Sequence, residues 1–225
     1  MSLHNQQTAV LLFTNSPELE SSRKRLIRNA TRNKSLVAQL YQRSREVIKA
    51  TRLPLIEINE DRQRGDTFGE RLHNAFQQAF SEGYERVICV GNDCAELSPR
   101  DLINAEEGLH TSDLVIGPDY RGGVFLLGLN RQLFTSTNWE SLKWQSAELI
   151  PSILKEATQA DVHFLIPKFD LNTTEDLSTQ LLYSAVLRTL VKNIYKEVYH
   201  PSRFISQLKP LASPTHFGLR APPAH

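Results

Sequence analysis

The sequence predicts an α/β fold with a mostly parallel central sheet, and the prediction starts from residues 86–97. Residues 87–90, Val-Ile-Cys-Val, are apolar at four consecutive positions, as in a strand that is covered on both faces of a parallel sheet. Gly91 allows the sharp turn that follows, and Asn92 and Asp93 then stand at the carboxyl end of the strand. Because open α/β sheets bind their ligands at that edge, this acidic loop is a candidate site for a metal and a phosphate, although a turn or capping aspartate would look the same.

The remaining elements are predicted from apolar periodicity and capping residues. Strands are expected at 9–13, 53–58, 87–90, 113–116, 124–129 and 162–166. A short helix is expected after Ser21 or Ser22. Further helices are expected at 34–51, from Asp66 or Thr67 to 80, and at 98–110, 131–134, 145–158 and 173–199.

The composition is that of an ordinary globular protein, with 225 residues, 40% hydrophobic and 23% charged. A net charge of +1 excludes a polyelectrolyte binder. Cys89 and Cys94 are too few for a disulfide scaffold and match no zinc pattern, which fits a reducing cytoplasm. No apolar stretch approaches the roughly 18 residues that a membrane-spanning helix needs, so we expect a cytoplasmic protein without membrane contact.

A basic segment lies between residues 23 and 52, where ten Lys and Arg face the single acid Glu46. Such a segment is most often the solvated surface of a helix. The functional alternative is that its positive charge attracts phosphate groups. Arg23 and Arg25 follow the first strand, where many α/β folds bind phosphates, so they are the candidates for that role. Nucleic-acid binding is not expected, because no aromatic interleaving or recognition motif accompanies the charge.

Two parts of the chain are predicted, a single domain over residues 1–199 and a proline-rich arm over 200–225. Five of the chain's 11 prolines lie in that last segment, a density that excludes regular helix or sheet. The arm would lie on the body, form a homo-oligomer contact, or be disordered.

Four motifs, in this order and spacing, resemble a known family. They are Gly-Asp-Thr-Phe-Gly-Glu-Arg-Leu at 65–72, Gly-Asn-Asp-Cys at 91–94, Gly117-Pro118 with Gly122-Gly123, and Asp-Leu-Asn-Thr-Thr-Glu-Asp-Leu at 170–177. The chain resembles, over about residues 9–177, a bacterial family of glycosyltransferase-A-like proteins. That family is described as glycosyltransferases of arsenosugar biosynthesis or as a domain of unknown function, and is related to the molybdenum-cofactor and 2-phospholactate guanylyltransferases.

The resemblance implies a three-layer α/β/α sandwich of the nucleotide-diphospho-sugar transferase type. It also implies a nucleotide-activated donor held by Mg²⁺ or Mn²⁺, for glycosyl or nucleotidyl transfer. Asp93 and Asp170 would be the catalytic and metal-binding carboxylates, a suitable set because Mg²⁺ takes one or two carboxylates plus phosphate oxygens. The remaining donor-binding positions would be Arg23, Arg25, Asp66, Gly122 and Gly123.

Three departures from the family pattern change charge. Glu20 stands at the family's loop glycine and, with nearby Glu18, would repel a phosphate. Arg121 replaces an aspartate, for which Asp119 could compensate, and Glu140 replaces a serine. Two hypotheses therefore remain: a metal-dependent transferase, or a non-catalytic relative that binds a ligand or a partner protein.

Overall fold

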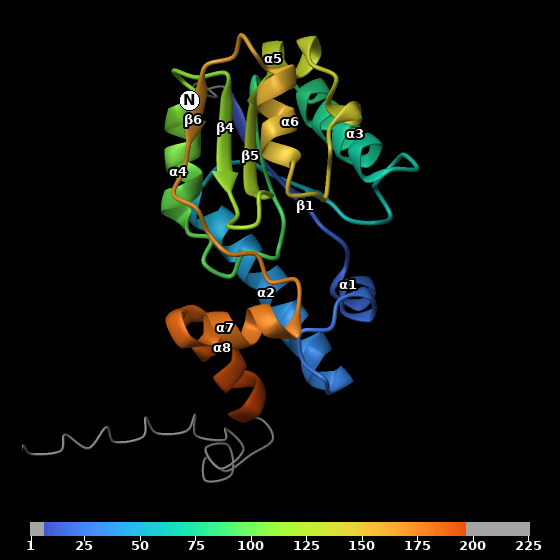
Figure 1. Ribbon diagram of the computed structural model, residues 1–225, viewed down its shortest axis with the longest axis vertical. Helices are drawn as coiled ribbons and strands as arrows, with labels where there is room; N and C mark the ends of the chain where they lie inside the picture. Colours follow the sequence, from blue (N-terminus) through green and yellow to red (C-terminus); the bar gives the residue numbers. More distant parts are fainter. Residues whose placement is uncertain (1–6, 197–225) are drawn as a thin grey trace, which may run out of the picture.

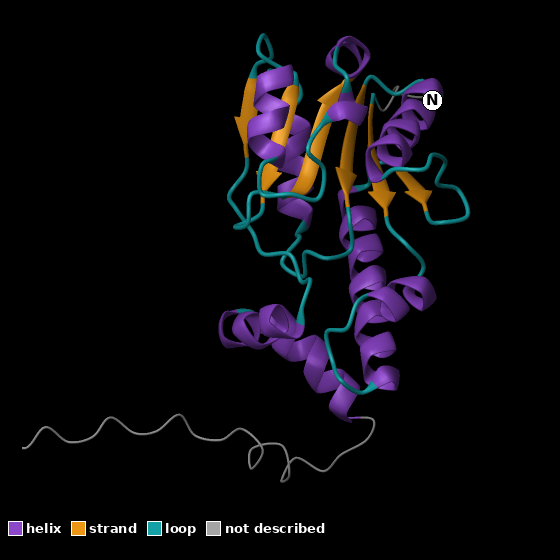
Figure 2. Ribbon diagram, turned by 45° about the vertical axis from the view of Figure 1, so that its right-hand side comes forward, coloured by secondary structure: helices purple, strands orange, loops and turns teal. Residues whose placement is uncertain are grey.

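A computed structural model describes residues 7–196, which form a mostly parallel sheet covered by helices on both faces (Figures 1 and 2). The six strands lie in the order β2-β1-β3-β5-β4-β6, and only β5 runs antiparallel to its neighbours. Their bounds are β1 Thr8–Phe13, β2 Leu55–Ile58, β3 Arg86–Val90, β4 Leu114–Pro118, β5 Val124–Asn130 and β6 Val162–Phe164. The predicted α/β fold is confirmed, and the five parallel strands bring their carboxyl ends to one edge.

The helices form two outer layers and a third packing unit below the sheet. Their bounds are α1 Pro17–Arg23, α2 Ala30–Thr51, α3 Phe68–Ser81, α4 Pro99–Gly108, α5 Arg131–Ser136, the short 3-10 helix η1 Trp139–Ser141, α6 Leu149–Glu156, α7 Thr174–Tyr183 and α8 Ala185–Lys196. Helices α3, α5 and α6 bury their apolar side chains on one face of the sheet, and α4 and the carboxyl half of α2 cover the other face.

The third core lies outside the two layers, where the amino-terminal half of α2 continues beyond the sheet and packs against α7 and α8 (Figure 2). Leu36 and Leu40 from α2 meet Leu177 from α7 and Leu187 from α8. Leu171, one residue after Asp170, is fully buried in the same core. The position of the predicted site therefore depends on this core as well as on the sheet.

Four predicted helices differ from the structure, and one of them, α2, begins at Ala30 instead of residue 34 because Asn29 caps it. Ser16, not Ser21 or Ser22, caps α1, and Pro17 occupies the first turn, where a missing N–H costs nothing. The helix predicted at 145–158 is shortened to α6, Leu149–Glu156, and Gln145 lies before it with a positive φ of 58° that a helix does not allow. The single helix predicted from 173 to 199 is divided at Ser184, whose backbone is extended and whose hydroxyl accepts a hydrogen bond from the Leu187 N–H at 3.0 Å.

The proline-rich arm predicted at 200–225 lies outside the described residues. Within residues 7–196, every helix is too short or too polar to cross a bilayer. Cys89 and Cys94 are both free thiols in the core.

Candidate functional site

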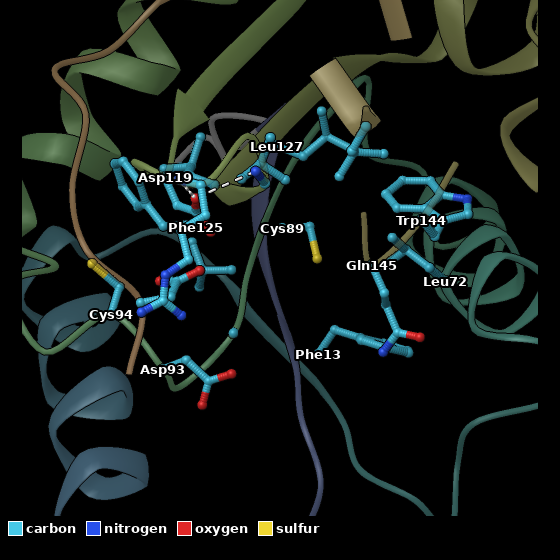
Figure 3. A pocket seen from close by; sticks show the side chains of 18 of the residues that line it. Phe13, Leu72, Cys89, Asp93, Cys94, Asp119, Phe125, Leu127, Trp144 and Gln145 are labelled. Carbon is cyan, nitrogen blue, oxygen red and sulfur yellow. Dashed lines mark hydrogen bonds between the residues drawn. The ribbon is translucent and has the colours of Figure 1, made fainter. Parts of the chain in front are cut away.

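Asp93 and Asp170 come from distant parts of the chain and line the same cavity of about 480 Å³ (Figure 3). Asp93 follows β3, and Asp170 follows β6 and the bridge between Asp119 and Lys168 that extends it. The Leu171 N–H donates to the Asp93 carbonyl at 3.0 Å, which ties the two loops together. The sheet edge therefore unites the two carboxylates that the sequence analysis selected.

Asp170 is held in an environment that disfavours its charge. Its Oδ1 atom is buried and accepts no hydrogen bond from any residue of the described chain. The pKa of Asp170 is raised to about 7, chiefly by burial and also by the nearby charges of Asp93 and Asp119, against the opposing effect of Lys24 and Arg121. A carboxylate oxygen without a hydrogen-bond partner, close to two other carboxylates, is suited to bind a cation or to carry a proton.

Lys24 is the nearest positive charge to Asp93, and the sequence analysis did not select it. Its ammonium group bonds to Asp93 Oδ1 and lies 3.7 Å from Glu20 Oε1, with only 10% of the side chain exposed. The buried Asn33 side chain holds the loop by donating to the Lys24 and Ser21 carbonyls and accepting from the Leu26 and Ile27 N–H groups. The one feature of the sequence that could have pointed to Lys24 is its position between Arg23 and Arg25.

The loop between β4 and β5 supplies a third carboxylate, but this one is committed to its own backbone. Asp119 Oδ1 accepts hydrogen bonds from the N–H groups of Arg121 and Gly123. A side chain at Gly122, where φ is 87°, would meet the Ala147 carbonyl at 2.4 Å, and one at Gly123 would meet Asp119 Oδ2 at 2.8 Å. Gly122 therefore lets this loop pack against Ala147, and Gly123 lines the cavity.

Arg121 does not stand free beside the carboxylates. Its guanidinium pairs with Asp176, a buried residue whose other oxygen accepts from the Asn172 and Thr173 N–H groups at 2.9 and 2.8 Å. Arg121 still lines the cavity. Arg121, which stands where the family has an aspartate, would repel a cation in the cavity. Its ion pair with Asp176, which the sequence did not reveal, reduces that repulsion.

The opposite wall of the cavity is apolar and aromatic (Figure 3). The Phe68 ring packs edge-on against Phe13, with 5.8 Å between centroids, and at a tilt against Trp144, with 5.7 Å between centroids. Trp144 is fixed by its Nε1–H, which donates to the Trp139 carbonyl at 2.7 Å. A Cβ at Gly69 would lie 2.7 Å from Trp144 Cδ1, so this glycine lets α3 approach the tryptophan.

A second cavity, of about 510 Å³, adjoins the first and is more polar. The two share Phe13, Phe68, Gly91, Asp93 and Gln145. Its polar lining consists of Thr14, Asn15, Glu20, Arg23, Glu60, Gln63, Arg71, Asn92, Asp93 and Gln145. Asp93 therefore stands at the junction of a polar and a partly apolar cavity.

Arg23, Arg25 and Asp66 do not behave alike. Arg23 lines the second cavity as predicted, whereas Arg25 and Asp66 are exposed and line neither cavity. Asp66 instead serves the start of α3, where its carbonyl accepts from Arg71 at 2.8 Å. Arg71 is the basic residue that the sequence analysis missed in this cavity, although it belongs to the same motif.

Two of the acidic residues that the comparison with the family pattern singled out lie away from both cavities. Glu18 pairs with Lys34 at 3.0 Å on the exposed side of α1, and the Lys34 hydrogen bond lowers the pKa of Glu18. Glu140 faces His73 and lines neither cavity. Of Glu18, Glu20 and Glu140, it is Glu20 that lines the second cavity, where its carboxylate accepts a hydrogen bond from the Asn15 side chain at 2.8 Å.

The residues present suit a shared metal better than a metal held by protein alone. Residues 7–196 contain no group of three His, Cys, Asp or Glu side chains close enough to hold an ion. Mg²⁺ commonly uses one or two carboxylates, waters and substrate phosphates, and the unpartnered Asp170 Oδ1 is a suitable ligand atom. Lys24 already pairs with Oδ1 of Asp93, so a metal at this carboxylate must share it with the ammonium group or displace that group.

Residues 25–141, just over half of the chain, match the family described as uncharacterized proteins conserved in bacteria, DUF2064. No curated protein matches the sequence at a significant level.

Two solved structures share the fold at low sequence identity. One, from Desulfovibrio desulfuricans G20, is named for the nucleotide-diphospho-sugar transferases. It has a TM-score of 0.66 and 20% identity over 84% of this chain and 98% of its own. The other is Rv0371C of Mycobacterium tuberculosis H37Rv, solved in complex with manganese. It has a TM-score of 0.50 and 12% identity over 79% of this chain and 100% of its own. At these identities the likeness shows the nucleotide-diphospho-sugar transferase type of fold.

Proposed function

The chain belongs to the DUF2064 family of bacterial proteins, and from its fold and site we propose that it is a metal-dependent transferase using a nucleotide-activated donor. The observation that carries the proposal is the meeting of Asp93 and Asp170 in one cavity, with Asp170 Oδ1 left without a partner. Ligand binding at the carboxyl edge of the strands is usual for open α/β sheets.

The two cavities suit different parts of the reaction. The second holds Arg23 and Arg71, whose charges would draw donor phosphates towards Asp93. The first has the aromatic wall of Phe68 and Trp144, which would exclude water and cover an acceptor. Transfer would then take place where the cavities join, at Asp93.

Mg²⁺ or Mn²⁺ held by Asp93 and Asp170 would offset the negative charge that develops on the phosphates of the leaving group. Before a metal binds, the pKa of the Asp170 carboxyl group is about 7, raised chiefly by burial, so metal binding near neutral pH would release its proton. Glycosyl and nucleotidyl transfer both fit this arrangement, and the link to arsenosugar biosynthesis stays a prediction.

The test is thermal melting with a panel of nucleotides and nucleotide sugars, each with and without Mn²⁺. A ligand present at 100 times its dissociation constant stabilises the folded chain by about 2.7 kcal/mol. We expect one nucleotide class to raise the melting temperature only with the metal, and Asp93→Asn and Asp170→Asn to abolish the rise. Asp66→Asn is the matched control, because Asp66 is exposed and lines neither cavity. A rise that persists in Asp93→Asn would contradict the proposal.

The second candidate is a non-catalytic relative that binds a ligand or a partner protein. The ion pair between Lys24 and Asp93 favours it, because it occupies the carboxylate that the reaction needs. This candidate predicts that any nucleotide that stabilises the chain does so equally with EDTA and with Mn²⁺. Metal dependence that requires Asp93 would exclude it.

A further inference from the structure

Lys24 holds a position that the proposed function does not explain. Its ammonium group bonds to Asp93 and lies beside Glu20, and its charge also acts on Asp170. Nearly all of the side chain is buried, so the charge is poorly solvated and depends on these acids. The surrounding carboxylates therefore already have one cation, and it is covalently part of the chain.

The backbone of Lys24 is fixed, whereas its side chain has alternative partners. Its N–H donates to the Glu20 carbonyl at 2.8 Å at the end of α1, and its carbonyl accepts from Asn33 at 2.7 Å. The side chain then extends to Asp93, which lines both cavities, while Glu20 lines the polar one. A lysine has four rotatable side-chain bonds, so the ammonium can leave Asp93 without movement of the loop.

We infer that Lys24 is a tethered cation that competes with a divalent metal for Asp93. The inference rests on the proposed function, because it assigns Asp93 as a metal ligand. Two cations at one carboxylate repel each other, and each unit of like charge at about 4 Å costs on the order of 4 kcal/mol near a protein surface. The metal therefore binds at Asp93 only when the ammonium has moved away.

Competition of this kind would couple the metal to the donor. A phosphate in the polar cavity offers Lys24 a new anionic partner, and the released Asp93 can then bind the metal. Metal and donor would thus enter together, and the metal alone would bind weakly to the wild-type protein.

The experiment is titration of the folded, full-length protein with Mn²⁺ alone, followed by the electron paramagnetic resonance signal of free Mn²⁺. Lys24→Met has a side chain of similar length without the charge, and Lys24→Gln is a second neutral variant. We expect both to bind Mn²⁺ at least tenfold more tightly than the wild type, and Lys24→Arg, which keeps the charge, to remain close to it. Adding Asp93→Asn to Lys24→Met should remove the gain.

Lys34→Met is the matched control, because Lys34 pairs with Glu18 on the exposed side of the neighbouring helix. It should bind Mn²⁺ as the wild type does. Equal or weaker Mn²⁺ binding by the two neutral variants, or a gain that survives Asp93→Asn, would overturn the inference.

The two proposals fail separately because this titration contains no nucleotide. If the wild type shows Asp93-dependent stabilisation by a nucleotide with Mn²⁺, but Lys24→Met gains no Mn²⁺ affinity, the competition is wrong and the transferase stands. If Lys24→Met gains Asp93-dependent affinity and no nucleotide binds, the competition stands and the transferase is wrong.

Discussion

At the scale of single residues, the site is dominated by acids whose charges are unequally compensated. Lys24 pairs with Asp93. Asp119 Oδ1 accepts hydrogen bonds from two N–H groups of the loop to which Asp119 belongs. Asp170 Oδ1 has no such partner within the described chain. Its environment therefore favours the neutral acid, and this has a measurable cost in stability.

Replacing Asp170 by asparagine should stabilise the metal-free protein at high pH. The pKa of Asp170 is raised from 3.8 to about 7, chiefly by burial, so the folded chain binds a proton that the unfolded chain has lost. For such an acid the free energy of unfolding falls as the pH rises between these values and stays lowered above them. Allowing for solvent near the cavity, we expect Asp170→Asn to gain about 1–2 kcal/mol at pH 8, or roughly 3–6 °C in melting temperature.

The measurement is thermal melting in EDTA at several pH values. The difference between the variant and the wild type should shrink as the pH falls towards 4. A difference that is the same at all pH values, or a loss of stability at pH 8, would show that the burial of Asp170 does not control its charge.

Gly122 should tolerate no side chain, since it combines a left-handed backbone with a close contact. We expect Gly122→Ala to destabilise the protein by about 2–4 kcal/mol, from a positive φ of 87° and a Cβ 2.4 Å from the Ala147 carbonyl. Trp144 fluorescence should also change, because residues 144–149 must shift. Gly83→Ala is the matched control: φ there is 100°, with nothing within 4 Å of the added carbon, so about 1 kcal/mol should be lost. Equal losses in urea unfolding would contradict the contact with Ala147.

At the scale of elements, the loop between α1 and α2 is held mainly by one side chain, that of Asn33. Asn33 lies in the first turns of α2 and makes four hydrogen bonds to the backbone of residues 21–27. This loop begins at Lys24, directly after Arg23, so the geometry of the site depends on a helix that lines neither cavity.

Asn33→Ala should therefore cost about 3 kcal/mol or more, because it leaves buried N–H and carbonyl groups without partners. Asn29→Ala is a suitable comparison. Asn29 caps the same helix through one bond to the Arg32 N–H at 3.0 Å, and its loss should cost about 1 kcal/mol. Urea unfolding measures both, and a smaller loss for Asn33 than for Asn29 would exclude this role.

At the scale of the whole molecule, residues 7–196 form three hydrophobic cores rather than one. Two lie on the faces of the sheet, and the third joins α7 and α8 to the protruding half of α2 (Figure 1). Leu171 belongs to the third core, so the packing of α7 and α8 positions Asp170.

Leu187→Ala should unfold the third core preferentially. Leu187 is fully buried, so its truncation should cost about 2–5 kcal/mol. We expect faster amide hydrogen exchange in α7, α8 and the amino-terminal half of α2, with the sheet still protected. Leu182→Ala, at a side chain 72% exposed, should change little. Uniform loss of protection across the sheet would mean that the three cores unfold together.

The sequence by itself determined the strands, the sheet type and the two principal carboxylates. Apolar runs such as residues 87–90 specify buried strands through local hydrophobicity, and the loops after parallel strands must meet at one edge. The sequence alone therefore placed Asp93 and Asp170 at the same edge of the sheet, and both line one cavity in the structure. Their roles in metal binding and transfer stay predictions.

Only the tertiary structure decided which partner each charge has. Lys24 on Asp93 is a contact across 69 positions, and Arg121 with Asp176 joins the loop between β4 and β5 to the first turn of α7. No local pattern encodes such contacts, because they depend on how the loops and α7 pack around the edge of the sheet. The exposure of Arg25 and Asp66 was hidden for the same reason, since a motif shows which residues are near in the chain and not where each side chain points. Folding thus gave Asp93 a lysine partner and left Asp170 without one.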